Sequence, residues 1–298
     1  DFDLAARDLL LVYFFTTIGI NASFKDLLEG GKPLLVLLVA TIAYMFVQNL
    51  TGISVAALFD LSAPVGLLGG TVSLVGGHGT AIAWAPRIAA DYGIANAMEI
   101  GLACATFGLI FGSLMGGPIA KFLITRHDLT PDKTEPLNVG LSEEDHEAGI
   151  GSLDFLDAIL AIHISILLGL VLNAGVQQLG LQLPLFVPCL FAGILITNLI
   201  PRNFPRITGR RWPARTTAMA VIADIALGTF LAMSLMSMQL WTLADLAGPI
   251  FTILAAQVAV AATVSIFIVF RVMGKNYDAA VICSGFGGIS LGSTPVAM

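Results

Sequence analysis

The feature that most constrains this chain is a series of apolar stretches, each close to the ~20 residues that a helix needs to cross a bilayer. They cover residues 8–23, 34–58, 97–124, 153–180, 183–200, 217–238 and 250–272. A transmembrane β-barrel would instead show short segments of alternating polarity. The stretches therefore predict an all-α polytopic membrane protein.

Composition agrees with this class and excludes several others. Apolar residues make up 57% of the 298 residues and charged residues only 11%, whereas a soluble domain carries about 25% charged residues. A soluble enzyme and a disordered chain are therefore excluded. The net charge of -6 provides no basic field for nucleic acid. The three cysteines are far apart, which argues against a disulfide framework or a structural metal site.

Two apolar stretches are too rich in glycine to form straight helices, residues 60–92 and 276–298. Each glycine lowers helix stability by about 1 kcal/mol relative to alanine. Irregular backbone at membrane depth persists only where it is buried in protein or lines a wet cavity. We therefore expect both stretches to be re-entrant or broken segments and to form an internal site.

The positions of the basic residues predict the same feature for residues 60–92. Residues 201–215 carry five arginines and belong on the cytoplasmic side, where Lys and Arg accumulate. The polar connector 125–152 then also lies inside. Lys25 and Lys32 are inside only if residues 60–92 enter and leave the membrane on the same side, as a re-entrant hairpin does.

An internal repeat predicts two copies of one helical unit. At an offset of 216 residues, Asp8 aligns with Asp224, Phe14 with Phe230 and Pro33 with Pro249. The loop at 24–32 and its counterpart at 239–248 fall on opposite sides, so the repeats are inverted. We expect a first inverted repeat at 1–124, a cytoplasmic connector at 125–152 and a second inverted repeat at 153–298.

The paired glycine motifs are the predicted binding site, because broken helices in matching repeats mark the site of a secondary transporter. Each motif ends in a hydroxyl residue that can cap a half-helix, Thr80 in the first and Thr294, before Pro295, in the second. Free N–H groups at a helix start suit a carboxylate, and unwound carbonyls with hydroxyls suit Na⁺. The alternative is that the glycines only allow close helix packing.

The candidate substrate- and ion-binding residues are Gly76, Gly77, His78, Gly79, Thr80, Gly288, Gly292, Ser293 and Thr294. Among these, Na⁺ is expected near Gly76, Thr80, Gly292 and Thr294.

Polar residues inside or next to the apolar spans are further candidates, since such residues are costly in a membrane and often functional. They are Gln48, Asn49, Asn96, Glu99, His163 and Asp224. Gln48 and Asn49 could hydrogen-bond substrate or join helices, and Glu99 with Asn96 could couple an ion. His163 and Asp224 could instead be neutral groups bonded to a neighbouring helix. Asp278 is expected to cap the second broken helix.

Three alternative functions belong to other classes of protein. Gly288–Gly292 matches the Gly-x-Ser-x-Gly pattern, so Ser290 with His78 as base would make an intramembrane serine hydrolase. A membrane segment is the wrong context for that motif. A nucleotide site is excluded because neither Gly-Lys pair is followed by Ser or Thr. A passive channel is the third alternative.

Several segments resemble the bacterial sodium/glutamate symporter family. They are TIGINA (17–22), Gln48–Asn49, GGHGTAIAW (76–84), ACATFGL (103–109), FLAMSLM (230–236), MGKNYDAAV (273–281) and GSTPVA (292–297). The resemblance implies two inverted five-helix repeats with re-entrant segments, a homodimer, an elevator-like motion and a location in the bacterial inner membrane. On the family pattern, this chain lacks the first two helices and the last one, and it departs at Phe286, Gly287, Ile289 and Ser290.

These observations together predict a secondary active transporter that carries L-glutamate into the cell with Na⁺. A related carrier of citrate or another dicarboxylate is the alternative within the same class. We expect no enzymatic activity and no cofactor, with Na⁺ acting as the coupling ion. The expected partners are L-glutamate, Na⁺, the bilayer and a second copy of the chain. Since the chain starts at Asp1 and stops inside an apolar segment, we expect it to be part of a longer transporter.

Overall fold

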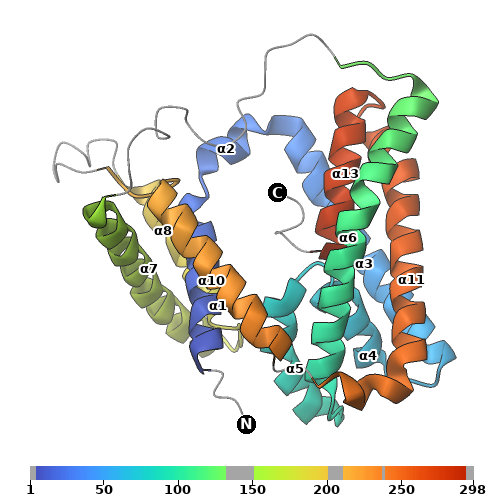
Figure 1. Cartoon of the computed structure of the whole chain (residues 1–298). Coiled ribbons are helices and arrows are strands. Elements are labelled where there is room, and N and C mark those ends of the chain that lie inside the picture. The colour runs from blue at the N-terminus through green and yellow to red at the C-terminus, as the bar shows by residue number, and fades with distance from the viewer. Residues whose placement is uncertain (1–4, 132–150, 201–210, 237–238, 293–298) are drawn as a thin grey trace. The chain divides into compact units, whose positions relative to one another are not determined.

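The computed structural model describes residues 5–131, 151–200, 211–236 and 239–292, and these are helical without any strand (Figure 1). Five of the helical segments are long and apolar enough to cross a membrane: Gly31–Leu58, Ala97–His127, Ser152–Gln178, Thr217–Met236 and Leu243–Val272. The predicted all-α polytopic membrane protein is therefore confirmed. Most of the connector at 125–152 and of the arginine loop at 201–215 lies outside the described residues.

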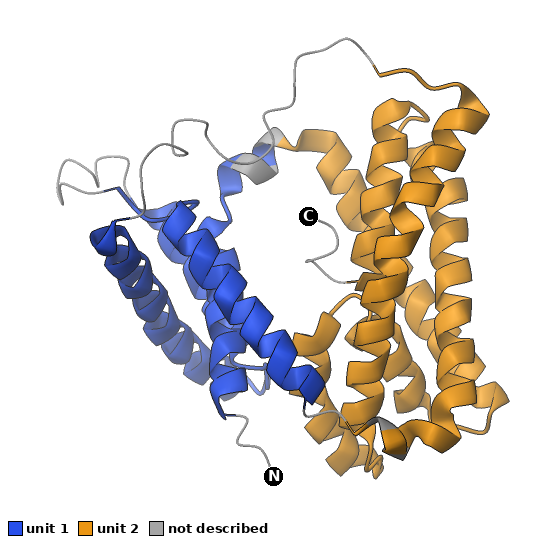
Figure 2. Ribbon diagram, viewed as in Figure 1, with its two compact units in different colours: residues 1–29, 135–236 blue, residues 30–134, 237–298 orange. Residues whose placement is uncertain are grey.

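The chain forms two compact units, and each takes segments from both halves of the sequence (Figure 2). Unit 1 combines Asp1–Glu29 with Glu135–Met236, and unit 2 combines Gly30–Thr134 with Ser237–Met298.

Unit 1 is a small helical bundle. Its helices are α1 (Ala5–Asn21), α2 (Phe24–Glu29), α7 (Ser152–Gln178), α8 (Phe186–Leu199) and α10 (Thr217–Met236). Helix α1 packs against α8 and α10, and α7 packs against α8. Glycines allow the backbones to approach closely, because a Cβ at Gly193 would lie 2.8 Å from the Ile20 nitrogen.

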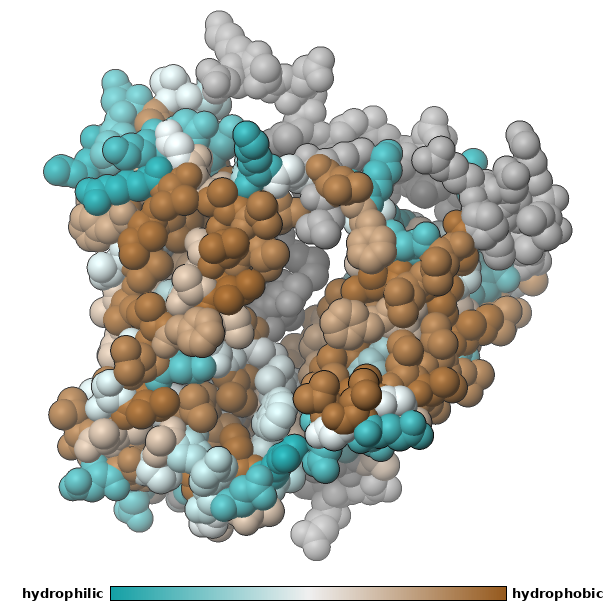
Figure 3. Space-filling view, turned by 180° about the vertical axis from the view of Figure 1, so that it is seen from behind, coloured by the Kyte–Doolittle hydropathy of each residue, from teal (hydrophilic) through white to brown (hydrophobic). Residues whose placement is uncertain are grey.

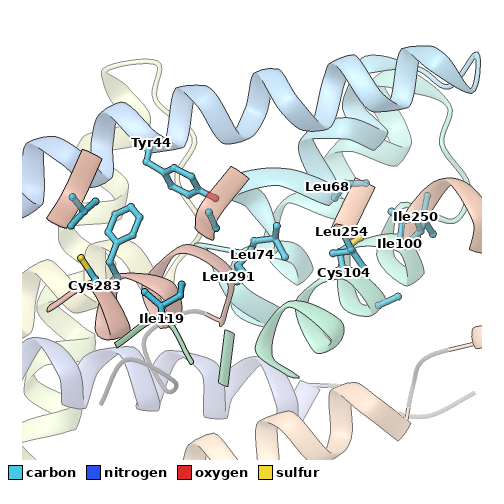
Figure 4. Packing of buried hydrophobic residues seen from close by; sticks show 14 of the residues in the cluster. Tyr44, Leu68, Leu74, Ile100, Cys104, Ile119, Ile250, Leu254, Cys283 and Leu291 are labelled. Carbon is cyan, nitrogen blue, oxygen red and sulfur yellow. The ribbon is translucent and has the colours of Figure 1, made fainter. Parts of the chain in front are cut away.

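Unit 2 contains both glycine-rich stretches. Its elements are α3 (Gly31–Leu58), α4 (Ala63–Leu67), η1 (Leu68–Val72), α5 (Gly77–Tyr92), α6 (Ala97–His127), η3 (Leu240–Leu246), α11 (Ala247–Val264), η4 (Ser265–Val269), α12 (Phe270–Val272) and α13 (Tyr277–Gly292). The core lies between α3, η1, α6, α11 and α13, with Tyr44, Leu74, Leu254 and Leu291 buried in it (Figure 4).

The outer faces of the helices are hydrophobic, as a lipid-facing surface requires. Leu50 and Leu114, both in unit 2, are 67% and 66% exposed, and Val171 in unit 1 is 68% exposed. Figure 3 shows hydrophobic side chains covering the middle of the helices and hydrophilic ones gathered towards their ends. Such extensive apolar exposure is rare on soluble monomers and indicates burial in a bilayer.

Candidate functional site

The first glycine-rich stretch is a broken helix within unit 2. It consists of α4 and η1, a turn at residues 73–76, and α5. Gly70 leaves helical geometry, with φ -114° and ψ -136°. Gly77 has a φ of +68°, in the left-handed region that favours glycine over residues with a Cβ. The predicted departure from a straight helix is therefore present, and glycines lie at its two irregular points.

The first arm of the broken helix runs back along the end of α3. A Cβ at Gly66 would lie 2.6 Å from the Gly52 backbone, and one at Gly70 would lie 2.9 Å from Asn49 Oδ1. Gly66 thus lies next to Gly52, and the later residue Gly70 lies next to the earlier residue Asn49. The first arm therefore runs antiparallel to α3. Thr71, at the inner end of this arm, faces Asn49, more than two turns before α3 ends.

The second arm, α5, runs antiparallel to α6. His78, at the start of α5, lies with its Nε2 3.0 Å from Thr106 Oγ1. One turn further along α5, Ala81 Cβ lies 3.1 Å from a Cβ placed on Gly101. The start of α5 is therefore next to the middle of α6, and α5 then follows α6 back towards its first turn.

The second glycine-rich stretch reaches the same part of α6. A Cβ at Gly112 would lie 3.1 Å from the Gly292 nitrogen, and one at Gly116 would lie 2.8 Å from Ser284 Oγ. Leu74 from the first stretch and Leu291 from the second both contact Gly108, and they lie side by side in Figure 4. Glycines on one face of α6 thus bring the two stretches together.

Two amide side chains on α3 hold the two stretches in place. Gln48 donates from Nε2 to the Ser290 carbonyl at 2.7 Å. Asn49 Oδ1 accepts hydrogen bonds from Thr71 N at 3.1 Å and from Thr71 Oγ1 at 2.7 Å. These bonds join α3 to both stretches, which is one of the two roles considered for this pair.

Gln257 on α11 is a further residue of the site that no sequence motif marked. Its side chain is fully buried, and Nε2 donates to the Gln48 carbonyl at 2.9 Å and to the Gly69 carbonyl at 3.2 Å. One side chain thus links α11 to α3 and to the broken helix. Its signal in the sequence was a lone amide inside the apolar span 250–272.

Three local predictions about the helix ends need correction. Helix α5 begins at Gly77, after Gly76, so Thr80 lies inside its first turn and does not cap it. The glycines from 285 to 292 do not break the second segment within the described residues, because α13 continues to Gly292. At the start of α13, Asn276 Oδ1 accepts the Ala279 N–H at 2.9 Å, which is the capping role expected of Asp278. Ser293 and Thr294 lie outside the described residues.

The hydrolase alternative has no catalytic pair. Ser290 Oγ donates to the Gly287 carbonyl at 3.0 Å, while His78 Nε2 pairs with Thr106. Both side chains therefore have other partners, and no Ser–His hydrogen bond occurs among the described residues.

The remaining candidates lie apart from the meeting point of the two stretches. Asn96 immediately precedes α6 and Glu99 lies in its first turn, and in the described part of the chain neither side chain bonds to the broken helix. His163, in unit 1, pairs with the Tyr13 hydroxyl at 2.9 Å and with the Ile159 carbonyl at 2.8 Å. Asp224 is exposed on α10.

The chemistry of the site is that of neutral oxygens and backbone N–H groups. No group of three or more His, Cys, Asp or Glu side chains that could hold a metal ion occurs in the ranges that the structure describes. The donors and acceptors are glycine backbone, hydroxyls and amides. Such a set suits a carboxylate at a helix start and a hard alkali cation at carbonyl oxygens.

A broken helix and a second glycine-rich helix meeting inside an apolar bundle define a multi-pass membrane transporter. The chain belongs to the sodium/glutamate symporter family, whose model matches residues 1–298. This confirms the resemblance seen in the motifs, and the family is one of transporters rather than enzymes.

Characterised relatives agree with this assignment. The sodium/glutamate symporters of Haemophilus influenzae and of Escherichia coli K12 are each 38% identical to this chain over 302 aligned residues. Each alignment covers 100% of this chain and 73% of the relative. No solved structure matches the chain significantly.

Proposed function

We propose that the protein carries L-glutamate across a bacterial inner membrane together with Na⁺, and that the site lies in unit 2 where Gly76–Thr80 meets Ser290–Gly292. The substrate and the ion are proposed because the whole chain matches the sodium/glutamate symporter family. The convergence of both glycine-rich stretches on Gly108 supports the position of the site.

Glutamate binds through its carboxylates at the start of α5. The N–H groups of the first turn of a helix have no partner within that helix, and the positive end of the helix dipole attracts an anion. Gly77, His78 and Gly79 provide these groups, and all three are buried. We propose that the other carboxylate of glutamate binds at Ser293 and Thr294.

Na⁺ binds to backbone carbonyl and hydroxyl oxygens of the two glycine-rich segments. Gly76, Gly77, Gly288 and Gly292 offer carbonyls near the ends of the two segments, and Thr80 and Thr294 offer hydroxyls. Because α5 begins at Gly77, Thr80 lies in its first turn. Thr80 is next to Gly76, since a Cβ placed on Gly76 would lie 2.6 Å from Thr80 Oγ1. This hydroxyl is therefore still at the proposed ion site.

The protein consists of two inverted repeats, at 1–124 and 153–298, each with a re-entrant segment. The order of elements supports this, because a shift of 216 residues brings α1 onto α10, α2 onto η3 and α3 onto α11 with η4 and α12. Asp60 and Lys275, just after the matched helices, both have a φ of +56°. Segment α4–η1 runs antiparallel to α3, and α5 runs antiparallel to α6. This arrangement supports a re-entrant hairpin at residues 60–92 that enters and leaves the membrane on the same side.

Uptake by the purified protein in proteoliposomes tests the function. With Na⁺ outside, labelled glutamate should accumulate against its gradient, while Li⁺ or K⁺ alone should not support accumulation. Accumulation distinguishes a carrier from a channel. Competition by unlabelled citrate, malate and aspartate tests the choice of substrate, and citrate competing better than glutamate would contradict it. A cross-linked species of twice the monomer mass in membranes would support the proposed homodimer.

A further inference from the structure

Unit 2 contains four buried side-chain oxygens without a hydrogen-bond partner among the described residues. They are Tyr44 Oη, Gln48 Oε1, Ser73 Oγ and Gln257 Oε1. Gln48 and Gln257 are 0% exposed, and Ser73 and Tyr44 are 1% and 2% exposed. Leaving a buried polar atom unpaired is costly, so four in one unit require an explanation.

The orientation of the two glutamine amides is fixed by their donors. Gln48 Nε2 faces the Ser290 carbonyl at 2.7 Å, and Gln257 Nε2 faces the Gln48 and Gly69 carbonyls at 2.9 and 3.2 Å. Exchanging the nitrogen and oxygen of either amide would place two acceptors against each other. Both Oε1 atoms are therefore acceptors without a hydrogen bond among the described residues, with the Tyr44 hydroxyl near the Gln48 amide and Ser290.

The surroundings of these amides are uncharged and rich in carbonyl acceptors. The carbonyls of Gln48, Gly69 and Ser290 each accept an amide hydrogen bond and keep a second lone pair. The buried polar and charged residues described in unit 2 are Gln48, Ser73, His78, Gln257, Ser265 and Ser290, without an acid, lysine or arginine. A group of carbonyl and amide oxygens without a charged side chain favours a hard monovalent cation.

The backbone is shaped to bring this cluster together. Gly52 and Gly66 touch, and a Cβ at Gly52 would also lie 3.2 Å from Gln257 Nε2. Gly70 leaves helical geometry directly after Gly69, whose carbonyl takes a side-chain hydrogen bond from Gln257. A side chain at Gly52 would push the amide of Gln257 away from α3 and η1.

We propose that Gln48 and Gln257 form a Na⁺ site, with their Oε1 atoms as ligands and the Gln48, Gly69 and Ser290 carbonyls as neighbouring oxygens. This inference rests on the proposed symport and adds a site on α3 and α11 to the one at the glycine motifs. A cation there holds together α3, α11, the broken helix and the end of α13. Because Ser290 is two residues from Gly292, occupancy of this site stabilises the glutamate site.

Substitution of Gln257 tests the site. Gln257→Met keeps the volume but removes the amide, and Thr252→Val, on an exposed face of the same helix, is the matched control. We expect the Na⁺ concentration for half-maximal uptake to rise about tenfold in Gln257→Met, with a lower Hill coefficient, as loss of one strong ligand predicts. Thr252→Val should match the wild type.

Direct binding of radioactive Na⁺ to the purified protein without glutamate is the second readout. Gln257→Met should bind less Na⁺ at saturation than the wild type. If this variant does not fold, Gln48→Met, which removes the other proposed side-chain ligand, should weaken Na⁺ binding in the same direction.

The outcomes separate this inference from the proposed function. Unchanged Na⁺ dependence and Na⁺ binding in folded Gln257→Met, with Na⁺-driven uptake intact, would overturn the site and leave the symport standing. Unchanged Na⁺ binding with a raised KM for glutamate would assign the oxygens to the substrate ammonium group and also overturn the Na⁺ site. Absence of Na⁺-driven uptake in the wild type would overturn the proposed function itself.

Discussion

At the scale of single residues, glycine has two structural roles in unit 2: it adopts a left-handed backbone conformation, and it allows helices to pack closely. Gly77 supplies a left-handed backbone where the broken helix turns into α5. Gly52 and Gly66 instead allow the backbones of α3 and α4 to pack closely, since a Cβ on either would collide with the other's backbone. The same residue type therefore marks both the irregular points of the site and the contacts that hold it in place.

Gly77→Ala is expected to reduce glutamate uptake, because alanine at a φ of +68° is strained by about 1–2 kcal/mol and shifts the N–H groups at the start of α5. Gly93→Ala is the matched control, since Gly93 has a φ of +71° at the other end of α5 and nothing within 4 Å of its Cβ position. Thermal unfolding should show similar losses in both variants. Equal uptake in the two would contradict a role for the start of α5 in binding.

At the scale of helices, α6 is the element on which both glycine-rich stretches assemble. It contacts α13 through Gly108, Gly112 and Gly116, and it contacts α5 through Gly101 and Thr106. In the absence of a hydrophobic driving force within lipid, close packing of small residues stabilises such contacts. The position of α13 therefore depends on which face of α6 carries glycine.

Gly116→Val is expected to destabilise the protein by about 1–3 kcal/mol, because its side chain would overpack the contact with Ser284 on α13. The neighbouring Gly117→Val should change stability by less than about 0.5 kcal/mol, since nothing lies within 4 Å of its Cβ position. Thermal unfolding in detergent measures both. Similar losses in the two variants would contradict the assigned face of α6.

The helices themselves could be predicted well and their ends less well. The apolar stretches 34–58 and 97–124 coincide with α3 and α6, because hydrophobic length decides where a chain crosses a membrane. The glycines of α13 were expected to break it, yet packing against α6 compensates for their low helix propensity. Thr80 was expected to cap α5, but the left-handed Gly77 already allows the helix to begin there.

The candidate site could be predicted in part. The glycine motifs predicted that two distant segments form one site, and both reach α6 at Gly108. Gln257 could not be assigned from the sequence, because its importance comes from the carbonyls of Gln48 and Gly69, which are 209 and 188 residues away along the chain. Which carbonyls face a lone amide is decided by tertiary packing.

At the scale of the whole molecule, the proposed symport predicts that membrane potential drives uptake. One glutamate anion entering with two or more Na⁺ carries net positive charge, and each charge gains about 2.3 kcal/mol per 100 mV. An inside-negative potential set with K⁺ and valinomycin in proteoliposomes should therefore raise glutamate accumulation. Accumulation that falls as the inside becomes more negative would contradict a net positive cargo.

The uncharged interior of unit 2 has a consequence for how tightly the two cargoes are coupled. Around the meeting point of the glycine-rich stretches, the buried described residues offer dipoles but no fixed acid, lysine or arginine. A negative amino acid alone would bring an unbalanced charge into a medium of low polarity. Bound Na⁺ then supplies the positive charge that the glutamate anion needs, so the protein itself needs no separate gate against the entry of glutamate without Na⁺.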